Sequence, residues 1–265
     1  MHIHDQHVHS SYSRDSQADI YKYAQTANQL GCKYFVTTEH IEFDSVATND
    51  DWCVDYPNLI KDLEKLKEQY PHMEFLLGIE IGYRKDKLNN MNEMLKSYPF
   101  DLVNMSIHDN GKVDYYMKRD FIEEGIESML NIYFNNIIDG LENYNDFDVL
   151  SHFDYGFKTA YLINPNLKLS NYEEYVKKIF NLIIKKDKTL EVNIKVQINQ
   201  GTDENLIYWL NLYKKMGGYK LTLSSDSHNN DDYFKNHEHY IKIIKEAGFN
   251  ELRYFVKRKE YIYNI

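Results

Sequence analysis

Histidine and carboxylate side chains recur along this chain in small groups, and each group follows a short apolar run. The groups contain His7, His9, Glu39, His40, Glu80, His108, His152, Asp154, Asp226 and His228. A mixture of imidazole and carboxylate without cysteine suits Zn, Mn or Fe, whereas structural zinc sites are often rich in thiolate and calcium takes oxygen ligands. The residue types therefore predict a site for divalent transition-metal ions.

The spacing within two groups supports a shared ion. Side chains of an extended segment alternate between its two sides, so His7 and His9 point to the same side, as do Asp226 and His228. One histidine at a strand end is usually a hydrogen-bonded or surface residue, but histidine follows five of the apolar runs here. We expect the remaining histidines to be structural or exposed; they are His2, His4, His72, His237 and His239.

The apolar runs alternate with longer helical patterns. Seven runs predict strands, at residues 3–8, 34–38, 75–79, 102–107, 147–150, 190–194 and 221–223. Apolar residues at three- and four-residue spacing predict helices at 20–30, 59–70, 121–141 and 172–184. Gly31 stands where a helix C-cap belongs. This alternation predicts a parallel sheet with crossover helices.

A closed barrel would gather the polar groups, whereas an open sheet would spread them along a line. In a (β/α) barrel the carboxyl ends of all strands open on one face. The 265 residues of the chain match the size of such a barrel, which is about 250 residues. We therefore expect a single α/β barrel domain over residues 1–265.

Composition narrows the class of partner. The chain has 31 Lys and Arg against 41 Asp and Glu, a formal charge of −10, which argues against a nucleic-acid ligand. A phosphate substrate is still compatible, because bound metal ions dominate the local field. Cys32 and Cys53 are too few for a disulfide framework. No apolar run of about 18 residues and no signal-peptide pattern occurs, so we expect a cytoplasmic protein without a membrane span, of unspecified oligomeric state.

Six segments resemble the motifs of the polymerase and histidinol phosphatase (PHP) family, in the family's order. They are Asp5-Gln6-His7-Val8-His9-Ser10 with Ser13 and Asp15, Thr37-Thr38-Glu39-His40, Gly78-Ile79-Glu80, Ser106-Ile107-His108, Ser151-His152-Phe153-Asp154 and Ser224-Ser225-Asp226-Ser227-His228. In that pattern the second His-x-His carries the ligands, not His2 and His4. The chain length and the lack of a polymerase module resemble the stand-alone histidinol-phosphate phosphatases of the family.

The resemblance implies a distorted (β/α)7 TIM-like barrel with a trinuclear site of two to three Zn, Mn or Fe ions. The implied ligand sets are His7, His9, Glu80 and Asp226 for one ion, Glu80, His108 and His152 for a second, and Asp15, His40 and His228 for a third. Glu80 bridges two ions in this scheme and is catalytic together with Asp226 and His228. Glu39 and Asp154 fit partners that orient a ligand imidazole.

The resemblance also implies a reaction, the hydrolysis of a small phosphomonoester by metal-bound hydroxide, with L-histidinol phosphate as the expected substrate. Members of this branch tend to have an arginine six residues after the histidine of the fifth strand, where this chain has Lys158. Lysine binds phosphate as a point charge and cannot form the bidentate fork of arginine. Arg14 and Arg84 are the alternative phosphate-binding side chains.

Three other functions fit the same residues. One is another PHP-type phosphoesterase activity, on nucleotides, oligonucleotides or phosphotyrosyl proteins, although no basic track for DNA is visible. Another is amidohydrolase-type C–N hydrolysis, which usually uses a carboxylated lysine as the bridge where this chain offers Glu80. A third is a metal-binding or regulatory protein without activity. Phosphate release from a panel of substrates distinguishes these functions.

Overall fold

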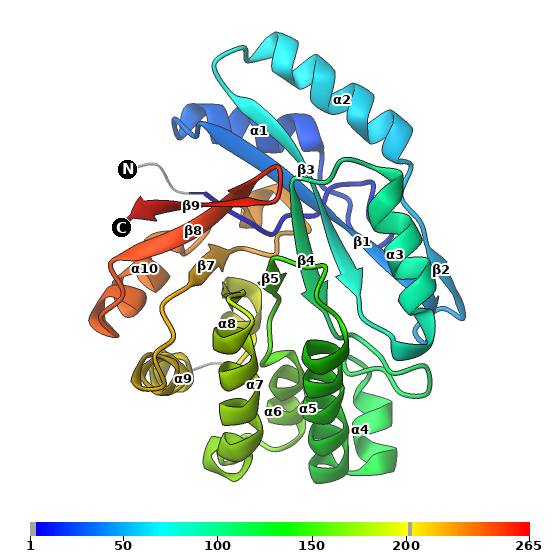
Figure 1. The fold of residues 1–265 in the computed structure, drawn as a ribbon, viewed down its shortest axis with the longest axis vertical. Helices are drawn as coiled ribbons and strands as arrows, with labels where there is room; N and C mark the ends of the chain where they lie inside the picture. Colours follow the sequence, from blue (N-terminus) through cyan, green and yellow to red (C-terminus); the bar gives the residue numbers. More distant parts are fainter. Residues whose placement is uncertain (1–3, 201–202) are drawn as a thin grey trace.

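The computed structural model describes residues 4–200 and 203–265, and its centre is a parallel sheet (Figure 1). In sheet order the parallel strands are β1 (Tyr34–Ser45), β3 (Glu74–Gly82), β4 (Leu102–Ser106), β5 (Val149–Leu150), β6 (Thr189–Asn193) and β7 (Leu221–Ser224). The short strand β2 (Asp50–Trp52) pairs antiparallel with the far end of β1. Helices pack around this sheet, as the alternating pattern predicts.

The segment around Val8 closes the barrel between β1 and β7. The Thr38 amide donates to the Val8 carbonyl (2.8 Å), and the Asp226 amide donates to the His7 carbonyl (2.9 Å). The predicted strand at 3–8 is nevertheless wrong for residues 4–7, and Val8 forms only an isolated bridge with Ser227; Ile3 lies outside the described residues. The reason is that side chains replace backbone partners, since the Val8 amide donates to Thr38 Oγ1 (2.9 Å).

Two strands extend further than the apolar runs indicate. The predicted strand at 34–38 continues to Ser45, so Glu39 and His40 lie within β1 and not after it. Glu80 likewise lies within β3. In the parallel register of these strands His40 is the partner of Glu80, which places the two side chains beside each other. The other predicted strands agree with β4, β5, β6 and β7 to within two residues.

The predicted helices are present, with one division. The helical elements are α1 (Ile20–Gln29), α2 (Tyr56–Gln69), η1 (Lys85–Lys87), α3 (Leu88–Ser97), α4 (Lys118–Glu124), α5 (Ile126–Asn143), α6 (Tyr155–Ile163), η2 (Leu169–Tyr172), α7 (Glu173–Lys185), α8 (Ile194–Gln200), α9 (Asp203–Lys215), η3 (Asn230–Asp232) and α10 (His237–Glu246). The helix expected at 121–141 is α4 and α5, because Gly125 has a φ of +82° and interrupts the hydrogen-bonded turns. Gly31 ends α1 with a φ of +70°, as expected of a C-cap glycine.

A hairpin that the sequence analysis missed covers one end of the barrel. It consists of β8 (Glu251–Val256) and β9 (Lys259–Asn264) and lies beside β7 and the N-terminal segment (Figure 1). Phe255 packs with Val36, Leu76, Leu102 and Val149, which stand near the beginnings of four strands. The opposite end, where the strands finish, is therefore the end that holds the polar groups.

No helix within the described ranges is both long enough and apolar enough to cross a membrane.

Candidate metal centre

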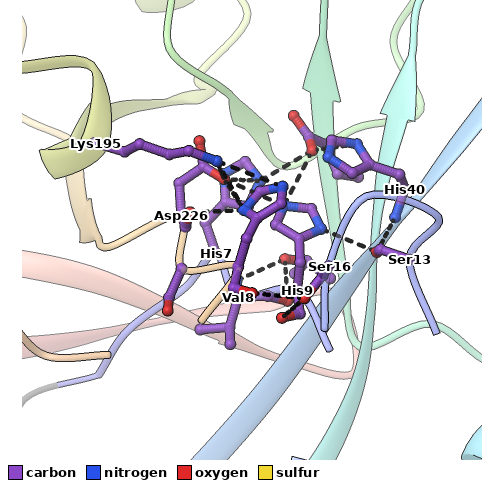
Figure 2. A network of polar contacts seen from close by, with 12 residues as sticks. His7, Val8, His9, Ser13, Ser16, His40, Lys195 and Asp226 are labelled. Carbon is purple, nitrogen blue, oxygen red and sulfur yellow. Dashed lines mark hydrogen bonds and ion pairs between the residues drawn. The ribbon is translucent and has the colours of Figure 1, made fainter. Parts of the chain in front are cut away.

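Glu80 is the centre of the polar cluster. Its carboxylate is fully buried and lies within reach of five imidazoles. Oε2 is 3.1 Å from His7 Nε2, 3.3 Å from His9 Nε2 and 2.8 Å from His40 Nδ1, and Oε1 is 2.8 Å from His152 Nε2 and 3.4 Å from His108 Nε2. Figure 2 shows the His7 and His9 rings of the N-terminal segment converging with the His40 ring of β1. The two oxygens therefore face two different groups of histidines, as a bridging carboxylate would.

Asp226 forms a second focus beside His9. Asp226 Oδ1 is 3.4 Å from His9 Nε2 and 3.4 Å from His228 Nδ1, and Oδ2 accepts a hydrogen bond from Asn193 (3.2 Å). The backbone of Asp226 has a φ of +50°, a conformation that costs free energy in a residue with a side chain and that often occurs at functional sites. The turn aims the carboxylate towards His7 and His9 (Figure 2).

Asp15 stands at the outer edge of the cluster. Its Oδ2 is 3.2 Å from His228 Nε2 and 3.7 Å from His40 Nε2, and its side chain is 40% exposed. His40 lies between Asp15 and Glu80, because its Nε2 faces Asp15 and its Nδ1 faces Glu80. The structure thus brings together all nine residues that the resemblance marks as ligands. Eight of them form overlapping groups, and within each group the possible ligand atoms lie within 4.8 Å of one another. These eight are His7, His9, His40, Glu80, His108, His152, Asp226 and His228.

Several buried donor atoms of the cluster lack a hydrogen-bond partner. Among the described residues, His7 Nε2, His9 Nε2, His40 Nδ1 and Glu80 Oε2 are buried and have no hydrogen-bond partner. Buried polar atoms are normally satisfied, because leaving them unpaired costs about 1–3 kcal/mol each. A divalent cation among these nitrogens and oxygens would satisfy them, so the residues fit a metal site.

The pKa shifts of the candidate ligands run in both directions. Burial, together with His40 and His228, lowers the pKa of His9 to about 3, so its imidazole is neutral and keeps a lone pair. Burial alone would raise the pKa of Glu80, but His40, His7 and His108 hold that pKa well below its usual value. Burial alone would lower the pKa of His7, His40 and His108, but Glu80 raises it for His7 and His40, and Glu42 with Glu80 raises it to about 10 for His108. Neutral imidazole and ionised carboxylate are the forms that bind metal ions, so a bound cation would displace protons from these three rings.

Carboxylates hold the ligand imidazoles in orientation. His7 Nδ1 lies 2.7 Å from Glu191 Oε1, and His108 Nδ1 lies 2.6 Å from Glu42 Oε1, so each ring can donate an N–H and keep Nε2 free for a cation. Glu42 has room because Gly82 has no side chain; a Cβ there would collide with its carboxylate. Glu39, the residue expected to orient a ligand imidazole, reaches one only through an intervening hydroxyl group.

Glu39 reaches His9 through Ser13. His9 Nδ1 lies 3.2 Å from Ser13 Oγ, which in turn donates to Glu39 Oε2 (2.5 Å; Figure 2 shows Ser13 between His9 and His40). The other residue expected in this role, Asp154, accepts a hydrogen bond from Gln197 Nε2 (2.7 Å).

Sequence reasoning missed Glu42, Glu191, Asn193 and Lys195. A signal for two of them exists, because Glu191 and Asn193 are polar residues inside the otherwise apolar run at 190–194. Glu42 shares a side of β1 with His40. Lys195 lies in the first turn of α8, and its Nζ lies 2.8 Å from His228 Nδ1 and 3.6 Å from Asp226 Oδ1.

A cavity of about 500 Å³ opens above the cluster. Its base includes Asp15, His40, His108, His152, Asp226 and His228, and its walls include Ser45, Ala47, Thr48, Trp52, Asp114, Tyr116, Tyr155, Lys158 and Lys195. Lys158 lies in the first turn of α6. Its Nζ stands over the rings of Tyr116 (4.8 Å) and Tyr155 (5.6 Å). Burial first, and then the charge of Lys195, lower the pKa of Lys158.

The structure does not bring the two arginines to this cavity. Arg14 is exposed and pairs with Asp50 (3.3 Å). Arg84 is buried and pairs with Asp86 (2.8 Å) and Asp109 (3.0 Å), beside a different depression of the surface. Both guanidinium groups therefore pair with carboxylates that do not line the cavity.

The remaining histidines lie outside the centre. His4 and His237 are buried, His72 bonds Asn28, and His239 bonds Asp203, in agreement with structural or surface roles. His2 lies outside the described residues.

Comparison with known proteins agrees with the motifs and the fold. The model of the PHP domain family matches residues 5–195. The chain is 27% identical over 254 residues to the histidinol-phosphatase of Lactococcus lactis, covering 95% of this chain and 93% of that protein. It is 25% identical over 256 residues to a probable histidinol-phosphatase of Clostridium acetobutylicum, covering 97% and 98%.

A solved structure shares the architecture. The crystal structure of histidinol phosphate phosphatase from Lactococcus lactis, complexed with Zn, L-histidinol and phosphate, superposes with a TM-score of 0.86 at 24% identity and covers 97% of this chain and 98% of that one. This likeness confirms the expected distorted TIM-like barrel. The family match spans well over half of the sequence and includes the motifs from Asp5 to Asp154. This chain therefore belongs to the PHP domain family.

Proposed function

We propose that this protein is a metal-dependent phosphomonoesterase that hydrolyses L-histidinol phosphate to L-histidinol and phosphate. The observation that carries the proposal is the set of imidazoles around the two oxygens of Glu80, at the base of a cavity large enough for a small substrate. Relatives named histidinol-phosphatase that align over nearly the whole chain support the choice of substrate. A cytoplasmic location stays a prediction.

The proposed cofactors are two to three divalent ions of Zn, Mn or Fe. The nine ligands would be His7, His9, Asp15, His40, Glu80, His108, His152, Asp226 and His228. Divalent ions supply activated water near neutral pH and neutralise charge on phosphate oxygens. Among the protein's own groups, Glu80 spans the cluster with its two oxygens, while Asn193 fixes one oxygen of Asp226 and leaves the other facing His9 and His228.

Lys158 and Lys195 are the proposed phosphate-binding side chains. Both line the cavity, and they are close enough for the charge of Lys195 to lower the pKa of Lys158. Two ammonium groups that share a partly buried space repel each other, and an anion between them removes that repulsion. The pair would therefore bind the phosphate as two point charges where the branch tends to use arginine.

Other residues that line the cavity suit a cationic alcohol. Asp114 is a buried residue that lines the cavity, and burial raises its pKa to about 6, so the carboxyl is largely ionised at neutral pH. Trp52 and Tyr116 offer aromatic surfaces in the same cavity. L-histidinol has an ammonium group and a flat imidazole ring that match these walls, whereas the additional phosphates of a nucleotide would be repelled by Asp114.

A phosphate-release screen tests the proposal. Purified, metal-replete protein is assayed against L-histidinol phosphate, sugar phosphates, nucleotides and bis-p-nitrophenyl phosphate. We expect the highest kcat/KM for L-histidinol phosphate. A preference for the bis-ester or for nucleotides would favour another PHP-type phosphoesterase, and C–N hydrolysis without phosphate release would favour the amidohydrolase alternative.

Substitution of Lys158 separates a phosphate contact from a solvated lysine. Removal of one charge-assisted hydrogen bond of about 1.5–3 kcal/mol means that Lys158→Ala should lower kcat/KM by roughly ten- to a hundredfold, with unchanged metal content. Lys158→Arg should retain or improve activity if the bidentate fork fits. Lys118→Ala, an exposed lysine on α4, is the control. Wild-type kinetics in Lys158→Ala would leave Lys195 as the phosphate contact.

A further inference from the structure

We infer that Arg84 is a positioning residue that ties together two segments of the chain that line the substrate cavity. The side chain is only 9% exposed. Its Nη1 donates to Asp109 Oδ1 (3.0 Å) and to the backbone carbonyl of Asp44 (3.2 Å). Nε and Nη2 donate to the two oxygens of Asp86 (2.9 and 2.8 Å). One planar guanidinium thus bonds groups from three separate segments of the chain.

Asp109 completes the tie from the other side. Its Oδ2 accepts the amide of Val46 (3.1 Å), and its Oδ1 accepts the amide of Gly111 (2.8 Å) as well as Arg84. Gly111 allows the guanidinium to approach, because a Cβ at this position would collide with Arg84 Nη2, and its φ of +83° also favours glycine. The Arg84–Asp109 pair therefore bonds the backbone of residues 44–46 to that of residues 109–111.

These two backbone segments lead directly into the cavity walls. The turn between β1 and β2 carries Thr48, and Trp52 follows in β2 with its Nε1 donating to Thr48 Oγ1 (2.9 Å). The loop after β4 carries Asp114 and Tyr116. All four residues line the cavity, although Arg84 itself does not. The relative position of the segments that carry Trp52 and Asp114 is consequently held by a pair whose two residues do not line the cavity.

Charge and burial explain why this tie would be rigid. The Arg84–Asp109 pair is buried on both sides, with side chains 9% and 3% exposed, and the planar fork makes several directional bonds. Removal of one member leaves the other charge buried and unpaired, which is strongly unfavourable. Lysine could not replace the fork, because a single ammonium cannot bond Asp86, Asp109 and the Asp44 carbonyl in the same planar geometry.

Trp52 fluorescence reports the position of the wall directly and does not require activity. The chain has two tryptophans, and Trp209 is buried at 1% exposure, so acrylamide quenching mainly measures Trp52. Arg84→Ala should increase the quenching constant in both metal-free and metal-replete protein. Lys85→Ala is the matched control, because Lys85 is the adjacent residue and forms an exposed ion pair with Asp139 (2.6 Å). Unchanged quenching in Arg84→Ala, or an equal increase in Lys85→Ala, would overturn the inference.

The kinetic arm rests on the proposed function. Arg84→Ala should raise KM for L-histidinol phosphate by about tenfold and change kcat by less than about threefold, because the walls loosen while the ligands keep their own supports. If wild-type protein releases no phosphate from this substrate, the proposed function fails but the quenching result still decides the role of Arg84.

A second variant keeps the test decisive if Arg84→Ala does not fold. Arg84→Met removes the guanidinium, Asp109→Asn removes the carboxylate charge, and the double variant of these two changes leaves neither charge buried alone. All three variants should show increased Trp52 quenching, and the effects of the two single changes should not add, because they remove the same tie. Full additivity, or wild-type quenching in the folded double variant, would contradict a shared positioning role.

Discussion

Glu80→Gln is expected to lower kcat/KM for L-histidinol phosphate by about a thousandfold or more, the largest effect of any single substitution considered. The amide has no charge and presents N–H groups to imidazole nitrogens that now lie 2.8–3.4 Å from carboxylate oxygens. It cannot bridge two cations. Steady-state phosphate release and elemental analysis of the same preparation should show that activity and metal content fall together.

Glu74→Gln is the matched control for this change. Glu74 begins the same strand, β3, but its half-exposed carboxylate pairs with Lys67 on the surface (2.9 Å). Exposed pairs contribute little, so the control should retain activity and metal. Glu80→Gln protein that keeps its full metal content and activity within about tenfold of wild type would show that Glu80 does not bridge.

Chelation should have the second-largest effect. Elemental analysis of untreated protein is expected to give about two to three transition-metal ions per chain, and dialysis against a strong chelator should reduce phosphate release to background. Because the ions bind the folded chain, their removal should also lower the Tm by about 10 °C, since binding at a thousand times Kd stabilises by about 4 kcal/mol. Calorimetry before and after dialysis measures the shift.

Reconstitution distinguishes this effect from damage. Addition of Mn or Zn to the dialysed protein should restore both activity and Tm. Glu80→Gln provides an internal comparison, because chelator should change its Tm less than that of the wild type. Turnover that persists with less than one ion per chain would instead favour a covalent nucleophile.

The candidate ligands could be predicted from the sequence because parallel strands finish at one end of a barrel. This topological rule locates His108 or His152 without any knowledge of their neighbours. The contacts that orient the ligands do not follow from such a rule. Glu191 meets His7 across 184 positions of sequence, and no local pattern contains that pairing. Its polar character within an apolar run was the one available sign.

The roles of basic residues were harder to predict for a related reason. The environment of Arg84 depends on three segments whose approach is set by tertiary structure, so its sequence neighbours do not reveal that its charge is neutralised. Strand extents were also underestimated. The apolar run of β1 ends before the polar residues Glu39 and His40, although the hydrogen-bonded ladder continues beyond them.

The closure of the barrel beside Val8 has a consequence for biosynthesis. Residues 7–9 leave the ribosome long before residues 226–227, which provide one side of their hydrogen bonds; the Asp5–Ser225 contact alone spans 220 positions. The early segment must therefore wait, with His7 and His9 still open to water, until nearly all of the chain has been synthesised. Such distant pairing makes folding slow, because the chain loses the entropy of loop closure before the stabilising contacts form. His9 meets Asp226 only after that point, so a cation that needs both side chains can bind only once most of the barrel has been made.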